Sequence, residues 1–137
     1  MAYEVIYPYI GDEIPKTALM KIVTETLNFE FPLVEISDQI SALELFQGPT
    51  LAFKDVGARF MARTLGYFNK NNQENITVLV ATSGDTGGAV AHGFLGVQGV
   101  KVVILYPKGK VSEIQEKQLT TLGQNITALE VEGVFDD

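Results

Sequence analysis

One stretch decides how the chain is read: Phe46-Gln47-Gly48-Pro49-Thr50-Leu51-Ala52-Phe53-Lys54-Asp55. Gly48-Pro49 ends any preceding regular element, because proline fixes its own φ and moves the preceding residue out of the helical region. Apolar residues then recur at helical spacing from Val56 to Phe68, which predicts a helix over that range. Lys54 therefore lies in or just before the first turn of the predicted helix.

The position of Lys54 has two interpretations. The positive end of the helix dipole repels a cation, and the apolar neighbours Leu51 to Phe53 would remove water from the ammonium group. Both effects favour the neutral amine, which is a nucleophile able to form a Schiff base with an aldehyde. The alternative is an ordinary solvated lysine whose charge is offset by Asp55, and residue type alone favours that alternative.

A second candidate site is the turn Thr82-Ser83-Gly84-Asp85-Thr86-Gly87-Gly88. Its small residues allow backbone N–H groups to approach a ligand, and a helix N-terminus can bind a carboxylate or phosphate. The spacing does not match the dinucleotide-binding or P-loop glycine patterns. A tight turn capped by Asp85 or Thr86 is the structural alternative.

The chain from residue 76 onward alternates predicted strands with predicted helices. The strands are predicted over residues 76–81, 100–106 and 126–131, and the helices over 86–97 and 112–122. The first strand is almost continuously apolar, as is typical of a strand buried on both faces of a parallel sheet. The class is therefore α/β, with a three-layer parallel sheet and crossover helices. The loops 82–88 and 107–111 both follow strands, so they should open onto the same edge of the sheet.

The N-terminal region is predicted to contain one helix and a pair of short strands. A turn over residues 11–15 precedes an apolar stripe at helical spacing, formed by Leu19, Ile22, Val23 and Leu27. Two strands are predicted over 31–36 and 40–46, joined by a turn at Ser37-Asp38. We expect residues 1–46 to be the remnant of an N-terminal region that continues upstream, and residues 47–137 to belong to a catalytic domain.

The segment from Glu44 to Asp55 resembles the pyridoxal-phosphate lysine segment of threonine synthases. A second match follows in Ala81-Thr82-Ser83-Gly84-Asp85-Thr86-Gly87-Gly88-Ala89, and the similarity continues through 106–112 and 115–119. The two matches together, in this order, are far more specific than either one alone. The resemblance covers most of the chain from about Phe31 onward and implies an incomplete pyridoxal-phosphate enzyme of fold type II.

The resemblance also implies roles for individual residues. Lys54 would be the catalytic residue and would hold pyridoxal 5'-phosphate, with Phe53 and Asp85 also contacting the cofactor. The substrate would be bound by Thr82, Ser83, Gly84, Asp85, Thr86 and Gly87. The implied reaction converts O-phospho-L-homoserine and water into L-threonine and phosphate. We expect Asp85 to face away from the substrate carboxylate, because like charges repel.

The family's Gly/Asn-rich loop for the cofactor phosphate has no counterpart in this sequence. We therefore expect an N-terminal fragment of a threonine synthase that is inactive by itself and retains the cofactor poorly. Lys108 and Lys110 are candidates for binding the substrate phosphate on charge alone.

Composition excludes several other classes. The net charge of −7 argues against nonspecific binding to nucleic acids, which depends on neutralising phosphates. There are no cysteines and His92 is the single histidine, so no metal site is expected. No segment is apolar for long enough to span a membrane, and no signal peptide is apparent. We expect a cytoplasmic protein, and the sequence leaves its oligomeric state open.

Two alternatives remain at this point. Another enzyme of the same cofactor fold, such as a serine/threonine dehydratase or a cysteine synthase, would carry a Ser-rich segment before its Lys-Asp pair. Residues 48–53 depart from that pattern. The other alternative is a noncatalytic α/β module that binds a small anion at the turn beginning with Thr82.

Overall fold

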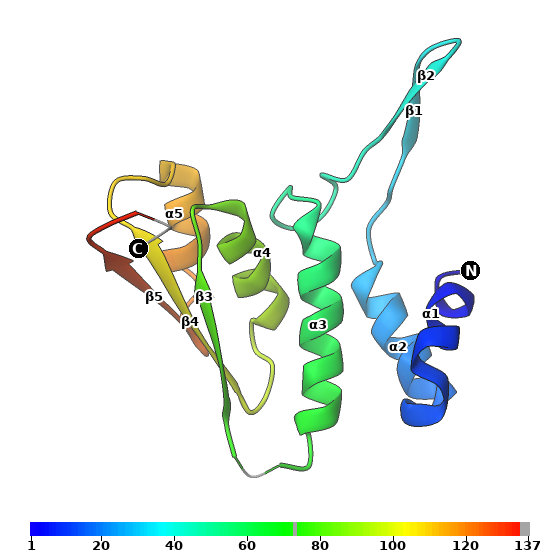
Figure 1. Cartoon of the computed structure of the whole chain (residues 1–137), viewed down its shortest axis with the longest axis horizontal. Helices are drawn as coiled ribbons and strands as arrows, with labels where there is room; N and C mark the ends of the chain where they lie inside the picture. Colours follow the sequence, from blue (N-terminus) through cyan, green and yellow to red (C-terminus); the bar gives the residue numbers. More distant parts are fainter. Residues whose placement is uncertain (73, 135–137) are drawn as a thin grey trace.

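The computed structural model describes residues 1–72 and 74–134 (Figure 1). Its elements follow the chain as α1 (Ala2–Ile10), a 3-10 turn η1 (Gly11–Glu13), α2 (Lys16–Thr26), β1 (Leu33–Ser37), β2 (Ile40–Leu43), α3 (Lys54–Asn69), β3 (Ile76–Ala81), α4 (Asp85–Phe94), β4 (Val100–Pro107), α5 (Glu113–Thr120) and β5 (Ile126–Val131). No helix in the described part of the chain is both long and apolar enough to cross a membrane.

Strands β3, β4 and β5 form a parallel sheet in that order, which confirms the predicted α/β class. Ile76 pairs with Val100, so β3 and β4 begin side by side, whereas Ile126 pairs with Val102, so β5 begins two residues further along β4. Helix α4 connects the first two strands and α5 connects the last two. The turns after β3 and β4 therefore lie at one edge of the sheet, as predicted from the strand order.

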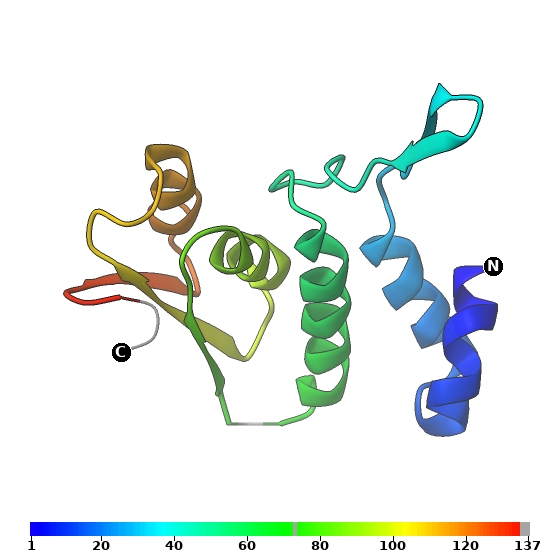
Figure 2. The ribbon, with the colours of Figure 1, turned by 45° about the horizontal axis from the view of Figure 1, so that its top comes forward.

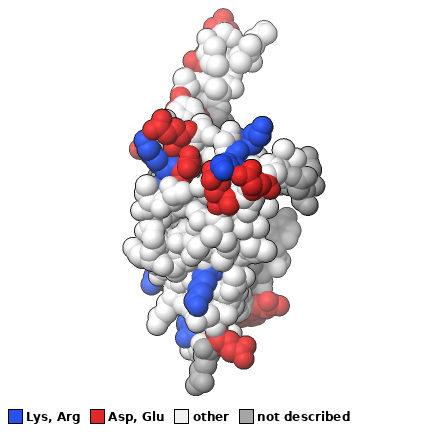
Figure 3. All heavy atoms as spheres, turned by 90° about the vertical axis from the view of Figure 1, so that its left-hand side faces the viewer, with Lys and Arg blue, Asp and Glu red and all other residues white. Residues whose placement is uncertain are grey.

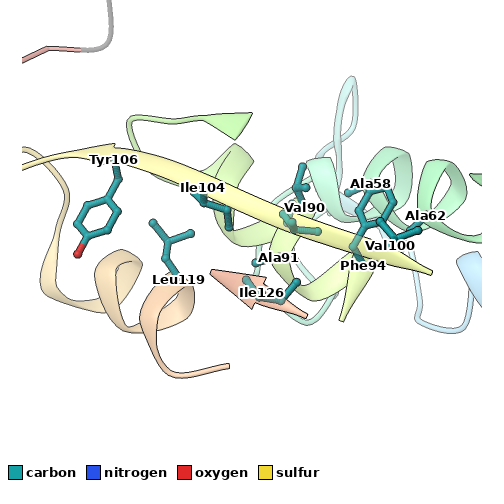
Figure 4. Packing of buried hydrophobic residues seen from close by; sticks show 12 residues of the cluster. Ala58, Ala62, Val90, Ala91, Phe94, Val100, Ile104, Tyr106, Leu119 and Ile126 are labelled. Carbon is teal, nitrogen blue, oxygen red and sulfur yellow. The ribbon is translucent and has the colours of Figure 1, made fainter. Parts of the chain in front are cut away.

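The main core lies between this sheet and helices α3, α4 and α5 (Figure 4). Phe94 of α4 is fully buried and packs with Ala58 and Ala62 of α3 and with Val100 of β4. Gly93 allows the two helices to approach closely, because a Cβ at this position would lie 3.0 Å from the backbone of Ala58. The two helices also lie close together where they begin, since the side chains of Lys54 and Asp85 form an ion pair.

Helices cover one face of the sheet in the described part of the chain, and this differs from the prediction for β3. The strand alternates between partly buried and exposed residues, and Leu79 is 66% exposed. The reason is topological: the strand order follows the chain order in one direction, so equivalent crossovers place α4 and α5 on the same face. Leu129 and Val131 of β5 are also exposed.

Helix α3 lies between the sheet domain and the N-terminal helices (Figure 2). Phe60 and Tyr67 on its other side pack against a second cluster, whose buried members are Ile14, Leu19, Ile22 and Val23. Arg59 donates hydrogen bonds to the carbonyl oxygens of Thr26 (3.2 Å) and Glu25 (2.7 Å) at the end of α2. Through these contacts α3 contributes to both hydrophobic clusters.

The N-terminal region contains one helix that sequence reasoning missed. Helix α1 includes Pro8, a residue that usually ends a helix, and Tyr3 stacks on Tyr7 with ring centroids 5.4 Å apart. The predicted helix behind residues 11–15 is α2. The predicted strand pair is the antiparallel hairpin β1–β2, shorter than expected, which projects from the body in Figure 1.

Candidate functional site

The loop before α3 is built around the carboxylate of Asp55. This side chain is 1% exposed and accepts hydrogen bonds from the backbone N–H of Thr50 (2.9 Å) and from its hydroxyl (2.6 Å). A Cβ built on Gly48 would overlap the same carboxylate, so glycine allows the loop to pass this close. Leu51 adopts a positive φ of 60° inside the loop. The backbone leading into Lys54 is thus held by one buried acid.

Lys54 is the first residue of α3, two residues earlier than the predicted helix start. Its side chain is 34% exposed, and Nζ lies 4.0 Å from Oδ2 of Asp85. Nζ also lies 4.4 Å from the centroid of the Phe53 ring. The amine is therefore only partly withdrawn from water, and a carboxylate from α4 stands beside it.

A cavity of about 450 Å³ lies next to the Lys54 side chain. Residues of α3 and α4 and the loop before α3 line it: Phe53, Lys54, Gly57, Ala58, Met61, Thr86, Ala89 and Val90. The wall is mostly apolar, and its polar side chains are those of Lys54 and Thr86. Such a cavity suits a flat ligand that has an apolar ring and a few polar groups.

Thr82 organises the turn between β3 and α4 from beneath. Its buried hydroxyl accepts hydrogen bonds from the backbone N–H groups of Gly84 and Gly87, both at 3.0 Å. It also donates to the carbonyl oxygen of Gly84 at 3.1 Å. A Cβ on Gly87 would overlap the Thr82 side chain. The hydroxyl of Thr82 is thus engaged with the turn itself.

Ser83, Asp85 and Thr86 are the exposed residues of this turn, whereas Gly84 and Gly87 are buried. Asp85 and Thr86 begin α4, and the first amides of a helix have no carbonyl partner within it. The exposed surface of the turn therefore offers hydroxyl groups and backbone N–H donors at the positive end of the α4 dipole.

Asp85 is also bound from α5. Gln115 Nε2 donates to Asp85 Oδ1 at 2.8 Å, while Gln115 Oε1 accepts from the backbone N–H and the hydroxyl of Ser112 at 3.1 and 3.0 Å. Asp85 thus faces Lys54 with one oxygen and Gln115 with the other.

The two candidate lysines for the substrate phosphate and the single histidine lie outside this arrangement. Lys108 forms an ion pair with Glu132 at 2.9 Å, and Lys110 is exposed in the loop after β4. His92 lies in the last turn of α4. Within residues 1–72 and 74–134, no group of three or more potential ligands could hold a metal ion. Figure 3, viewed from the side of β5, shows acidic and basic side chains interspersed on a largely uncharged surface.

Sequence reasoning missed the roles of Asp55 and Gln115. The alternative of a solvated Lys54 assigns Asp55 to offset the lysine charge, whereas the structure buries Asp55 beneath the loop. The pattern Ser112-x-x-Gln115 is a capping-box signal, and the structure contains that box. Nothing in the local pattern indicated that the other end of the Gln115 amide reaches Asp85, 30 residues away.

The arrangement fits pyridoxal phosphate. An aldehyde needs a reachable amine, which Lys54 supplies, and the aromatic ring needs an apolar wall, which the cavity supplies. The turn at the start of α4 offers donors for a carboxylate beside that ring.

Comparison with known proteins gives relatives over almost the whole chain. Threonine synthase from Buchnera aphidicola subsp. Baizongia pistaciae is 52% identical over 135 residues, which is 98% of this chain. The chain spans 31% of the length of that relative. The crystal structure of threonine synthase from Escherichia coli superposes with a TM-score of 0.86 at 49% identity, covering 97% of this chain and 31% of the other.

The structure described as threonine synthase from Brucella melitensis with bound pyridoxal phosphate superposes with a TM-score of 0.91. It is 41% identical and covers 98% of this chain and 30% of the other. The family model described as "Pyridoxal-phosphate dependent enzyme" matches residues 33–137, which include Lys54, the turn after β3 and Gln115. The chain therefore belongs to the pyridoxal-phosphate dependent enzyme family.

Proposed function

We propose that this chain is the lysine-bearing part of a threonine synthase, which converts O-phospho-L-homoserine and water into L-threonine and phosphate. The observation that carries the proposal is the 4.0 Å approach of Lys54 Nζ to Asp85, which joins the two segments that resemble threonine synthases. The identity of 52% to a threonine synthase supports the same conclusion.

Lys54 has two tasks in this proposal. Its amine would hold pyridoxal phosphate at the cofactor's aldehyde carbon, beside Phe53 and Asp85. When bound, the cofactor supplies an electron sink for negative charge that develops next to the substrate amine. Once released, Lys54 would act as a base at the substrate α-carbon, and its position at the cavity gives it access to that atom.

The turn after β3 would bind the substrate carboxylate. Ser83 and Thr86 offer exposed hydroxyls, and the backbone of Gly84, Asp85 and Gly87 shapes the start of α4. Thr82 supports these residues from below through its hydrogen bonds to the turn. The carboxylate of Asp85 is engaged with Gln115 and lies near Lys54, so it need not oppose the substrate carboxylate.

We further propose that residues 47–137 belong to the catalytic domain and that residues 1–46 are the remnant of an N-terminal region. The sheet packs in one hydrophobic cluster and α1 and α2 in the other, which supports this division, and α3 packs against both clusters. We also propose a cytoplasmic location and a small-molecule substrate. On its own the chain should be inactive, because its cavity is open and it spans 31% of the length of its relative.

Reductive trapping tests the role of Lys54 in the chain itself. Pyridoxal phosphate is added, borohydride reduces any bond between its aldehyde carbon and an amine, and peptide mapping locates the modified lysine. We expect label on Lys54 in excess of Lys101, and loss of that excess in Lys54→Arg. Label spread evenly over the exposed lysines would contradict the proposal and would favour a noncatalytic anion-binding module.

A chimera tests the reaction. This chain would replace the matching part of Escherichia coli threonine synthase, to which it is 49% identical over 133 residues. We expect the chimera to form threonine and phosphate from O-phospho-L-homoserine, Lys54→Ala to abolish this, and Lys101→Ala to retain it. A folded chimera that deaminates serine or threonine instead would show that the chain comes from a dehydratase.

A further inference from the structure

Gln115 has an amide group whose two ends are held by different elements. Its oxygen accepts from the N–H and hydroxyl of Ser112, at 3.1 and 3.0 Å, as part of the capping box that begins α5. Its nitrogen must therefore point the other way, where it donates to Asp85 Oδ1 at 2.8 Å. The helix cap thus fixes which end of Gln115 faces the site.

Asp85 is shared between Gln115 and Lys54. Oδ1 accepts from Gln115, and Oδ2 lies 4.0 Å from Lys54 Nζ. A charge-assisted hydrogen bond between an ammonium and a carboxylate is shorter, about 2.7–2.9 Å. The bond from Gln115 therefore holds Asp85 near the lysine without a close ion pair.

Gly84 gives Gln115 the space to reach Asp85. A Cβ at this position would lie 2.5 Å from Gln115 Nε2, so any other residue would push the amide away. The φ of Gly84 is 152° and it directly precedes α4. Three separate features thus fix the Gln115 amide in one position: the space left by Gly84, the capping box and the hydrogen bond to Asp85.

We propose that Gln115 is a positioning residue for Lys54, acting through Asp85. It keeps the Asp85 carboxylate turned partly away from the lysine. The carboxylate then stays near the Lys54 amine without forming a close ion pair, and the amine stays available to react. The importance of this for catalysis rests on the proposed function of Lys54. The physical claim, that Gln115 controls the surroundings of the Lys54 amine, can be tested without the cofactor.

The test measures how fast Lys54 is acetylated by limiting acetic anhydride, with peptide mapping and with Lys101 as the internal reference. Gln115→Met keeps the length of the side chain but removes the donor. Gln115→Glu removes the donor and keeps the cap, because a glutamate at this position also accepts from the Ser112 N–H. In both variants Asp85 should close on Lys54 and slow its acetylation about two- to five-fold.

Two controls separate positioning from a general effect. In an Asp85→Asn background, Gln115→Met should leave the acetylation of Lys54 unchanged. Gln98→Glu adds the same charge at the opposite edge of the sheet, at an exposed position, and should have no effect. Far-ultraviolet circular dichroism checks that each variant is folded. If Gln115→Met does not fold, Gln115→Glu alone tests the proposal.

A slower acetylation of Lys54 that requires Asp85 supports the proposal, and a faster one contradicts it. An unchanged rate, or the same change in the Asp85→Asn background, overturns it. The outcome is independent of the proposed function, because acetylation needs neither cofactor nor substrate. If Gln115 controls acetylation but the chimera with Escherichia coli threonine synthase forms no threonine, the positioning stands and the enzymatic proposal fails.

Discussion

The hydroxyl of Thr50 donates a 2.6 Å hydrogen bond to the carboxylate of Asp55, and the Thr50 backbone N–H donates a second one at 2.9 Å. Both residues are buried, so this acid has little water to replace a lost donor. The pair holds the loop that delivers Lys54 to the cavity.

Thr50→Val should lower the free energy of unfolding by about 1.5–3 kcal/mol, because a buried carboxylate loses a hydrogen bond and keeps its desolvation cost. Urea denaturation measures this loss. Thr50→Ser is the matched control, since it keeps the hydroxyl and should lose far less stability. Equal losses in the two variants would show that the methyl group, and not the hydrogen bond, stabilises the loop.

Gly48→Ala should also destabilise the chain, by about 1–3 kcal/mol, because the new Cβ would overlap the buried Asp55 carboxylate. Gly57→Ala is the comparison. It lies on an exposed position of α3 with open space around it, and alanine there should stabilise the helix by about 0.5–1 kcal/mol. Unfolding midpoints that move in the same direction for both variants would contradict the assigned packing.

Gly93→Ala should separate α3 from α4, because the added Cβ would lie 3.0 Å from the backbone of Ala58. The backbone cannot rotate away as a side chain can, so we expect a loss of about 1–3 kcal/mol. We also expect less trapping of pyridoxal phosphate on Lys54, since the distance to Asp85 depends on this packing. If the variant is destabilised but traps as much pyridoxal phosphate, the placement of Lys54 beside Asp85 does not depend on the packing of α3 against α4 at Gly93.

Tyr106 should make stability depend on alkaline pH. Burial raises the pKa of this phenol above its ordinary value of 10.0, and the carboxylates of Glu116 and Glu130 add to the shift. The folded chain then keeps a proton that the unfolded chain releases, so the stabilisation is complete below about pH 10 and falls as pH rises further. Tyr106→Phe should weaken this fall, measured by urea unfolding at about pH 8 and about pH 10.5.

Tyr9→Phe is the control for this titration, because Tyr9 is 89% exposed. It should leave the pH dependence of unfolding as it is in the parent chain. An equal response to both substitutions would mean that the pH dependence arises from other groups.

The strands were the most predictable part of the fold. Residues 76–81 and 126–131 are predicted with their observed bounds, because short apolar runs ended by turn residues leave few other interpretations. The side of the sheet covered by helices was less predictable. The almost continuously apolar pattern of residues 76–81 is typical of a strand covered on both faces. In the described part of the chain helices cover only one face, so Leu79 is exposed although its pattern predicts burial.

The candidate site was predictable in its parts and less so in its connections. Strand order alone predicts that the turns after β3 and β4 lie at one edge of the sheet. The resemblance to threonine synthases predicts that Lys54 belongs to the same site. The bond between Gln115 and Asp85 depends on how two helices pack, and the burial of Asp55 depends on a loop whose path no periodicity describes. Such contacts follow from the assembled fold and not from local propensity.

Helix α3 links the unfolding of the N-terminal helices to that of the sheet region. It buries Ala58 and Ala62 against the sheet side and packs Phe60 and Tyr67 against α1 and α2. Loss of either cluster removes the packing from one side of the helix that begins with Lys54. The N-terminal helices are remote from the cavity, yet they contribute to the cooperativity of unfolding. Substitutions that destabilise α1 or α2 should therefore make the position of Lys54 less well defined.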